Sequence, residues 1–551
     1  MQRTCQITGQ QFETTEQELA FLQKMNLPVP NICYQERLRK RLAFRNDRKL
    51  FHRTCDQSGK QLISMYPADS PQTVIDKEIW WSESYDATSY GRDFDFSRPF
   101  FDQFYELMIA VPHPNLITLN STNSEFTNYN GWNNNCYLCF AGNTLEDSCY
   151  CYNVENSKDC YDCLNLFESE LCYQCVESEN LYNCFFALHS KNCSESYFIE
   201  DCIGCRNCIF CYNLNNKEYC IQNQQVTKEQ YEQYLKDLQL NTKQGLETAY
   251  NFWRSESLKH PKKALHNIQT ENCTGEYISQ SKNCHNCYMV HAKNEDCNNI
   301  FNGFPIMKDS QDCCFSGENS ELINETNSTG ANAYNCICTM MVINNCKNIS
   351  YSDYLIGCED CLGCSGMHKK KYCILNKQYA KEEYETLKTK IIQHMKQTDE
   401  LGQFFPIKFS PFAYNESVAQ DYFPLSKQEI DQRGYKYKDP DQKEYQPQTY
   451  QVPQNITDAP EDITQQILAC TKTGKNFKLI AKDLAFYKKF SLAIPDLCPD
   501  QRHMQRLHLK NPPEIYQRTC AKTGQPILTS YSPDRPEIVY SEQAYNELVY
   551  G

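Results

Sequence analysis

Cysteine is the residue type in this chain whose spacing most plainly suggests chemistry. Cys202, Cys205, Cys208 and Cys211 stand three residues apart, and closely spaced thiolates bind zinc or iron–sulfur clusters. A ferredoxin run, however, has three residues before its last cysteine and a proline after it, whereas Tyr212 follows here. Two interpretations stay open: a metal or cluster site, or cysteines that pack as small apolar side chains. We prefer the second.

A second set of cysteines lies near the two ends of the chain, in the pattern Cys-x-x-[Ser/Thr]-Gly-[Lys/Gln]: CQITGQ, CDQSGK, CTKTGK and CAKTGQ. The pattern looks like a zinc knuckle in which a hydroxyl replaces the second metal ligand, with glycine allowing a tight turn. Each end has three cysteines, one fewer than a structural zinc site needs. The candidate zinc ligands are Cys5, Cys33, Cys55, Cys470, Cys498 and Cys520. The alternatives are a metal-free module and a catalytic zinc with an open position.

Basic residues follow Cys33 and Cys498 on segments that read as helices. Arg37 and Arg41 recur at the other end as Arg502 and Arg506. A basic helix beside a ribbon-like turn suits contact with phosphates, so these four arginines are our nucleic-acid candidates. A solvated helix face is the simpler alternative.

The two ends match without insertion or deletion when residues 4–86 are shifted by 465 positions, which indicates an internal duplication. A second duplication relates the ends of two cysteine-rich blocks, because IGCRNCIFCYNLNNKEYC returns as IGCEDCLGCSGMHKKKYC. We expect helices after both blocks, the first with Thr227 and Gln230 as a capping box, that cap or separate them. We expect another helix near residue 100, with Ser97 as N-cap, to cover the open first coil.

The cysteines of the first block keep a strict register. Of the fifteen between Cys136 and Cys220, fourteen occupy positions congruent modulo three, and Cys149 is the exception. Several also recur every 21 residues, a plausible coil length for a parallel β-solenoid. Asn or Asp often precedes the cysteine, which predicts turns and amide ladders with cysteine pointing inward. We therefore predict a mainly β fold with helices, in which a duplicated parallel β-solenoid is flanked by two small zinc-ribbon-like α+β modules.

The predicted organisation has eight parts. They are a ribbon-like module (1–86), an aromatic-rich capping segment (87–135), the first solenoid block (136–226), a helical insertion (227–266), the second block (267–378), a capping helix (379–397), a Pro/Tyr/Gln-rich linker (398–467) and a second ribbon-like module (468–551).

The composition of the chain limits the kinds of function that we expect. The chain has 551 residues, 34 cysteines and a formal net charge of −14, which argues against general affinity for nucleic acid. Its first residues do not resemble a secretory signal, and no apolar run reaches the ~18 residues of a membrane span. We therefore expect a cytoplasmic protein with reduced thiols.

Three long segments resemble an uncharacterised cysteine-rich protein family of candidate phyla radiation (Patescibacteria) bacteria: SPFAYNESVAQDYFPLSKQEIDQRGYKYKD, ELAFLQKMNLPVPNIC with DLAFYKKFSLAIPDLCPDQR, and YQRTCAKTGQPILTSYSPDRPEIVY. The resemblance covers nearly the whole chain and implies a bacterial setting and zinc-ribbon-like ends. Relatives tend to carry Cys-x-x-Cys and Cys-Pro-x-Cys-Arg there. This chain departs from that pattern at Thr8, Glu36, Thr473 and Gln501.

Our first hypothesis is a non-enzymatic scaffold or binding protein with an unknown macromolecular partner, most simply a protein. It rests on the absence from the sequence of a phosphate loop, a nucleophile elbow and a metalloprotease motif. The alternatives are a zinc-dependent nucleic-acid-binding or processing protein that acts through the terminal modules, a carbohydrate-active β-helix enzyme, and a redox or thiol-storage protein.

Overall fold

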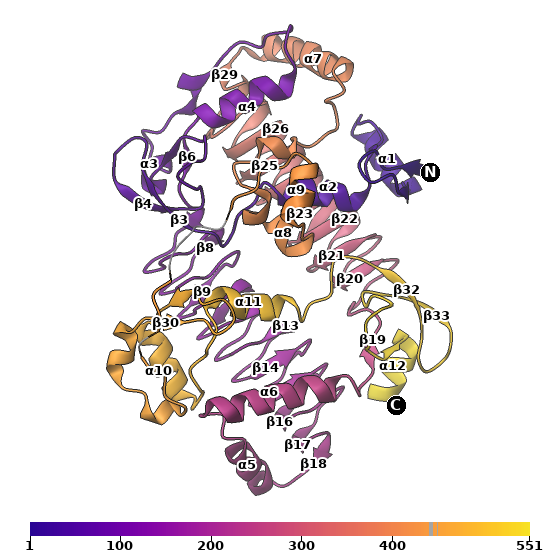
Figure 1. Ribbon diagram of the computed structural model, residues 1–551. Coiled ribbons are helices and arrows are strands. Elements are labelled where there is room, and N and C mark those ends of the chain that lie inside the picture. Colours follow the sequence, from indigo (N-terminus) through magenta and orange to yellow (C-terminus); the bar gives the residue numbers. More distant parts are fainter. Residues whose placement is uncertain (440–444, 449, 551) are drawn as a thin grey trace. The chain divides into compact units, whose positions relative to one another are not determined.

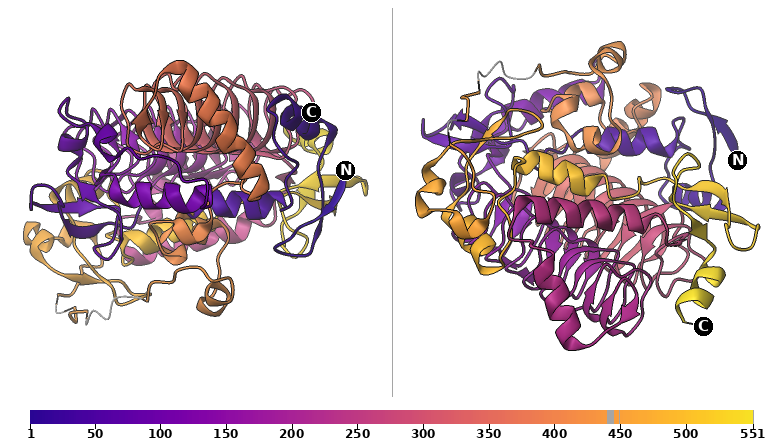
Figure 2. Two further views of the ribbon diagram at one scale, coloured as in Figure 1. Left: turned by 90° about the horizontal axis from the view of Figure 1, so that it is seen from above. Right: turned by 60° about the horizontal axis from the view of Figure 1, so that its bottom comes forward.

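The computed structural model describes residues 1–439, 445–448 and 450–550. Residues 440–444 and 449 of the predicted linker, and residue 551 of the last module, lie outside the described residues. The chain divides into two compact units, Met1–Ile117 with Leu265–Asp439 and Thr118–Ala264 with Pro440–Gly551. Each unit contains a β-solenoid and helices packed on it (Figures 1 and 2). The fold is therefore mainly β with helices, as predicted.

The solenoid of the first unit is a ladder of parallel strands that ends in an antiparallel pair. Its strands are β20 (Gly275–Ile278), β21 (Cys287–Val290), β22 (Glu295–Gly303), β23 (Met307–Ser316), β24 (Ser320–Thr329), β25 (Tyr334–Ile343), β26 (Lys347–Ile356), β27 (Glu359–Leu362), β28 (Lys371–Ile374) and β29 (Lys377–Gln378). Coils here are 11 to 13 residues long, as the spacing of stacked asparagine pairs shows.

Helices and hairpins surround this ladder. The helices of the first unit are α1 (Glu16–Lys24), α2 (Tyr34–Leu42), α3 (Lys77–Trp80), α4 (Phe100–Ala110), α7 (Lys381–Gln397), α8 (Val418–Tyr422) and α9 (Lys427–Gln432). Its other strands are β1 (Gln2–Thr4), β2 (Gln11–Glu13), β3 (Phe51–Thr54), β4 (Gln61–Ser64), β5 (Val74–Ile75) and β6 (His113–Pro114). Helix α7 follows the last coil and buries Tyr384, Ile391 and Met395, so it caps that coil as expected.

The second unit has coils of 12 residues. Its ladder strands are β10 (Tyr152–Glu155), β12 (Leu164–Phe167), β13 (Val176–Glu179), β14 (Phe185–Leu188), β15 (Tyr197–Glu200), β16 (Arg206–Ile209), β17 (Glu218–Ile221) and β18 (Gln224–Gln225), beside the short pairs β7 (Thr118–Leu119) with β8 (Asn130–Gly131) and β9 (Leu145–Glu146) with β11 (Ser157–Lys158). Its helices are α5 (Lys228–Asp237), α6 (Lys243–Ser257), α10 (Ala481–Lys489), α11 (Pro499–Leu507) and α12 (Glu542–Val549). The remaining strands are β19 (Lys262–Lys263), β30 (Leu468–Ala469), β31 (Asn476–Phe477), β32 (Tyr516–Thr519), β33 (Pro526–Thr529) and β34 (Val539–Tyr540). Figure 1 shows α6 lying across the coils.

The three-residue register of the cysteines has a backbone cause. From Asn120 to Gln222, every third residue has φ between +46° and +62°, so each coil is a square of four three-residue sides. The residue after each left-handed corner points inward. The cysteines of the register occupy that position, and their side chains are at most 2% exposed. Asn and Asp precede them because these residues tolerate the left-handed conformation best after glycine.

The 21-residue coil length expected from the cysteine spacing is wrong. Cross-coil partners such as Tyr161 with Tyr173 are 12 residues apart. Any multiple of three keeps a residue facing inward, so a 21-residue recurrence is one full coil of 12 plus three further sides. The amide ladders are confirmed: Asn153 donates to Asn165 at 3.0 Å, and Asn165 to Glu177 at 2.7 Å.

Inward serines show that the cysteines act as small packing residues. The Ser148 hydroxyl donates to the Glu146 carbonyl and accepts from the Cys160 N–H, 12 residues on. The Cys151 thiol lies one side further along and likewise contacts carbonyls two residues back and nine residues on. A cysteine thiol and a serine hydroxyl can therefore occupy equivalent inward positions and bond to the backbone there.

Three expectations about the covering segments need correction. Residues 118–135 already pair within the second unit's ladder, so the capping segment ends earlier than expected. Helix α4 is capped by the Glu400 carboxylate, which accepts from the N–H groups of Phe100 and Phe101, and not by Ser97. Its apolar face packs on the last coils of its own unit, where Phe100 contacts Tyr351, and not on a first coil.

The predicted linker also contains packed structure. Residues 398–439 include α8 and α9, and Phe404, Phe405 and Tyr414 are fully buried. Clusters of aromatic residues in a Pro-rich segment are as compatible with packing on a surface as with an extended linker, so composition misled the interpretation. The capping box of Thr227 and Gln230 at the start of α5 is confirmed.

Candidate functional site

Two of the three cysteines in the first module meet. Cys5 begins a tight turn closed by the Gly9 N–H, and Cys33 is the N-cap of α2. The Cys33 N–H donates to the Cys5 sulfur at 3.4 Å. Cys55 lies in a separate turn, where its sulfur accepts from the N–H groups of Ser58 and Asp76. The three candidate ligands therefore do not form one site.

The last module repeats this division. Cys470 begins a turn closed by the Gly474 N–H, and Cys498 is the N-cap of α11. The backbone N–H of Cys498 is one of the donors that lower the pKa of Cys470. Cys520 lies in the other turn, and its sulfur accepts from the Ser541 N–H at 3.2 Å.

The donor set does not fit the zinc that ribbon-like ends imply. Within the described part of the chain, no group of three Cys, His, Asp or Glu ligand atoms lying within 4.8 Å of one another includes a cysteine. Thr8 supplies only a hydroxyl, and Glu36 is buried in ion pairs with Arg39 at 3.1 Å and Arg433 at 3.2 Å. Tetrahedral zinc therefore lacks two of its four ligands at Cys5 and Cys33.

The four cysteines from Cys202 to Cys211 line four successive sides of one coil and face inward. The Cys202 thiol contacts the carbonyls of Glu200 and Cys211, and the Cys211 thiol contacts those of Ile209 and Cys220. Their sulfurs are directed at the backbone and fully buried. This arrangement supports the packing interpretation over a metal or cluster.

The four arginines predicted to contact nucleic acid are buried and form ion pairs with acidic residues of the solenoids. Arg37 lies 3.0 Å from Asp312, and Arg41 pairs with Glu325, both acids being left-handed corner residues of the first unit's solenoid. In the second unit, Arg502 and Arg506 both pair with Asp162 at 2.9 Å. All four arginine side chains are at most 4% exposed.

The phosphate-contact prediction for these four arginines is therefore wrong. Their charges are neutralised by acids of the solenoid wall, which holds each helix against its coils. Sequence reasoning missed the acids, although Asp162 stands at a corner position in the three-residue register and could have been singled out there.

The turn cysteines are set up as thiolates. Burial opposes ionisation at Cys5, but hydrogen bonds from the Thr8 side chain and from nearby backbone N–H groups lower its pKa to about 7. At Cys470, burial is likewise outweighed by Thr473 and backbone donors, and the pKa again falls to about 7. Donors from Ser541 and Thr523 lower the pKa of Cys520 to about 6 in spite of burial.

These pKa values predict alkylation that is selective and depends on pH. Because the thiolate is the nucleophile, the reaction of Cys5 and Cys470 with iodoacetamide should rise about tenfold between pH 6 and 8, through pKa values near 7. Inward cysteines such as Cys184, whose pKa burial raises, should stay unmodified in the folded chain. Peptide mass spectrometry after timed labelling measures both. Equal labelling of Cys184 and Cys5 would contradict the assignment.

A cleft in the first unit has the size of a ligand site. It has a volume of about 460 Å³, within the range of small-molecule pockets. The end of α1 and the following turn, strands β24 to β26, helix α7 and Leu401 form its walls. Its apolar lining residues are Met25, Leu27, Leu322, Tyr334, Ile337, Tyr351, Ile392 and Leu401, and its polar ones are Lys24, Asn26, Asn335, Asn348, Ser350 and Lys388.

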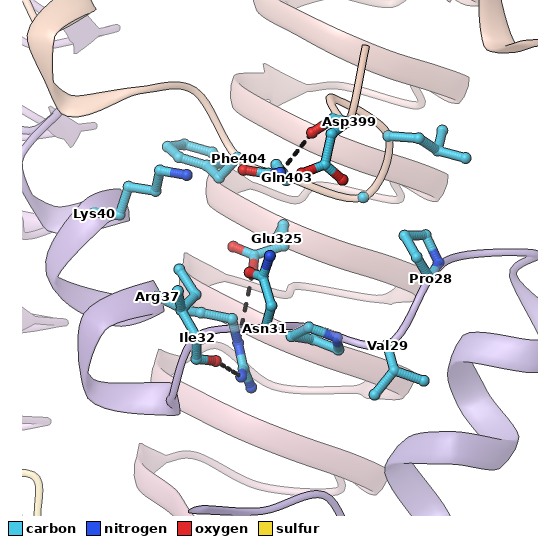
Figure 3. Close-up of a pocket in the computed structure, with 13 residues that line it drawn as sticks. Pro28, Val29, Asn31, Ile32, Arg37, Lys40, Glu325, Asp399, Gln403 and Phe404 are labelled. Carbon is cyan, nitrogen blue, oxygen red and sulfur yellow. Dashed lines mark hydrogen bonds and ion pairs between the residues drawn. The ribbon is translucent and has the colours of Figure 1, made fainter. Parts of the chain in front are cut away.

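A smaller hollow shares Leu401 with this cleft and is also lined by Pro28 and Gly402. Figure 3 shows Lys40 on one side, Pro28 and Val29 on the other, and Glu325 between them. Its volume of about 60 Å³ has room for only a few water molecules. Burial lowers the pKa of Lys40. The larger cleft is therefore the better candidate for a ligand.

Fold and side-chain geometry together define a cysteine-lined β-solenoid protein. Comparison with models of known families, with curated proteins and with solved structures found no match. Among the described residues, no helix combines the length and the apolar character that crossing a membrane requires.

Proposed function

We propose that this chain is a non-enzymatic binding protein that takes an anionic ligand with an apolar body into the cleft of its first unit. The observation that carries the proposal is the lining of that cleft. Two lysine side chains and several amide and hydroxyl groups stand beside an apolar surface, and no residue of the lining is acidic. Such a combination of apolar wall and a few directed polar groups is typical of ligand sites.

The charges of the cleft indicate the class of ligand. Lys388 lies beside the Tyr384 ring at 5.5 Å, a cation–π distance, and Lys24 is half exposed and 3.1 Å from Asp309. Asn335 donates to Asn348, which in turn donates to Asp360, so the amide ladder forms a fixed polar edge. An anionic group beside Lys388, with an apolar part against Tyr334 and Ile337, matches this arrangement.

The lining argues against the carbohydrate-active alternative at this cleft. Glycoside hydrolysis normally requires a pair of carboxyl groups flanking the bond that is cleaved. The residues that line the cleft include no Asp, Glu, His or Cys. Binding without chemistry is therefore the better-supported function.

One outward column of the first unit's solenoid gives no support to nucleic-acid binding. Along one outward column of the first unit, acidic and basic residues mostly alternate from coil to coil: Lys282 pairs with Glu271 at 3.0 Å and Lys308 with Glu295 at 3.7 Å. An alternating column compensates its own charge and offers no positive field to a phosphate backbone.

We infer in addition that the terminal modules are copies of one ancestral module that binds to a solenoid wall through two arginines. The support is the 465-residue offset, which relates Arg37 and Arg41 to Arg502 and Arg506, and the pairing of both sets with corner acids. In this proposal the modules stabilise the coils, and the coils provide the binding wall.

The anionic aromatic dye 1-anilinonaphthalene-8-sulfonate tests the cleft. We expect one dye per folded chain, and at least about tenfold weaker binding in Lys388→Ala, because one charged hydrogen bond contributes about 1.5–3 kcal/mol. Tyr334→Ala should weaken binding as well. Fluorescence titration gives the affinities.

Two matched variants serve as controls. Lys390→Ala removes an exposed lysine two residues further along α7, outside the cleft lining. Tyr182→Ala removes an outward tyrosine of the other solenoid that is 46% exposed. Both should bind the dye as the unaltered chain does. Equal losses in Lys388→Ala and Lys390→Ala would refute the proposed site.

A further inference from the structure

We propose that the cysteine pairs Cys5 with Cys33 and Cys470 with Cys498 are two equivalent sites for a soft, two-coordinate d¹⁰ cation such as copper(I). This inference is independent of the ligand cleft. It starts from the mismatch with zinc: both terminal modules place two cysteines side by side while lacking the other two ligands.

The first support is the contact itself. In the first module the Cys33 N–H donates to the Cys5 sulfur at 3.4 Å, which places the two cysteines side by side. In the last module Cys498 is likewise the N-cap of its helix, and its backbone N–H is one of the donors to the Cys470 sulfur. The two cysteines of each pair are 28 residues apart in the sequence, in the first module and in the last. Two separate parts of the chain thus build the same dithiol.

The second support is the set of neighbouring groups. Glu36 is held by Arg39 and Arg433, and the corresponding Gln501 carries no charge, so neither module supplies a third anionic ligand at this position. Soft thiolates select copper(I), and this ion readily takes two thiolates in a nearly linear arrangement. A two-thiol site therefore satisfies copper(I) while leaving zinc short of ligands.

The third support is access. The turn residues 6–10 beside Cys5 and 471–475 beside Cys470 are exposed, so a cation can reach these sulfurs by a small displacement of the turn. The inward cysteines of the solenoids lie behind the coil walls, where their thiols contact backbone carbonyls. A backbone N–H also donates to a neighbouring cysteine sulfur at Cys284 with Cys273 and at Cys358 with Cys346, so it is the exposed turn that distinguishes the two terminal pairs.

Binding of copper(I) releases one proton from each pair. One thiolate and one thiol bind Cu⁺, the thiol releases its proton to water, and the product is a bis-thiolate complex with one net negative charge. The Cys33 N–H, which already donates to the Cys5 sulfur, offsets part of that charge. No oxidant or reductant is required.

Titration of the full-length, reduced chain with copper(I) under anaerobic conditions tests the proposal, with bathocuproine disulfonate as competing chelator. We expect two tightly bound ions per chain, and X-ray absorption should show two sulfur neighbours for each copper. Cys33→Ser should retain one ion, Cys498→Ser should retain one, and the double variant should retain none.

The isolated turn cysteines provide the control. Cys55→Ser and Cys520→Ser change thiols of the same turn type that lie outside the two pairs, so both should still bind two ions. Circular dichroism verifies the fold of each variant, and Cys5→Ser with Cys470→Ser gives a second, independent pair of changes. Unchanged copper binding in folded Cys33→Ser/Cys498→Ser would overturn the proposal, as would equal losses in Cys55→Ser.

Discussion

Asp162→Asn is expected to destabilise the second unit by about 3–5 kcal/mol, the usual cost of removing one partner from a buried ion pair. Asp162 is fully buried and receives both Arg502 and Arg506, at 2.9 Å each. Asparagine keeps the size of the side chain and tolerates the left-handed corner at φ +54°, so the lost charge is the main change. Hydrogen exchange of α11 and of the coils around residue 162 should rise accordingly.

The same substitution one corner earlier is the matched control. Asp159 also lies at a left-handed corner, φ +51°, but is only partly buried and holds neither arginine. Asp159→Asn should change stability by no more than about 0.5 kcal/mol, as is typical of surface positions. Adding Arg502→Met and Arg506→Met to Asp162→Asn should recover most of the loss, because neither arginine is then left buried without its acid. Exchange rates that stay unchanged in Asp162→Asn would contradict the anchoring role.

Gly275→Ala should have the second large effect, a loss of about 3 kcal/mol or more in the first unit. Gly275 begins β20 with φ +133°, a region that residues with a side chain rarely adopt. A methyl group there would overlap the carbonyl oxygen of Cys287 on the next coil and lie 2.7 Å from its nitrogen. Because that obstacle is backbone of the paired strand, β20 would have to separate from β21. Urea unfolding monitored by circular dichroism measures the loss.

Gly59→Ala separates conformational strain from steric overlap. Gly59 has φ +72°, and a methyl group there would meet no atom within 4 Å. We expect a cost of about 1–2 kcal/mol from the left-handed backbone alone. If Gly275→Ala were no more destabilising than Gly59→Ala, the close approach of the two coils would not be a determinant of stability.

The inward cysteine positions could be predicted because their cause is local. A left-handed residue every third position sets a three-residue side, and the residue after the corner faces inward whatever the rest of the chain does. Asn before Cys is the local sign of that geometry, as Asn183 before Cys184 illustrates. The coil length could not be read in the same way, because it is set by how many sides close into one turn. Spacings of 12 and of 21 both preserve the inward direction.

The roles of the charged residues depended on distant partners. Arg41 pairs with Glu325, which is 284 residues away, and Arg506 with Asp162, which is 344 residues away. A basic helix looks the same in sequence whether it faces phosphates or a wall of acids. The same holds for Cys55, whose pattern matches that of Cys5 but whose turn has no second thiol beside it.

The sequence by itself therefore determined the class of fold, the inward register and the helix cap at Thr227, because these follow from backbone conformation and hydrogen bonding within a few residues. Only the tertiary structure decided the 12-residue coil, the burial of the four arginines, the pairing of Cys5 with Cys33 and the cleft beside Lys388. Each of these arises where segments far apart in the chain meet, and the free energy of such contacts depends on partners that no local pattern identifies.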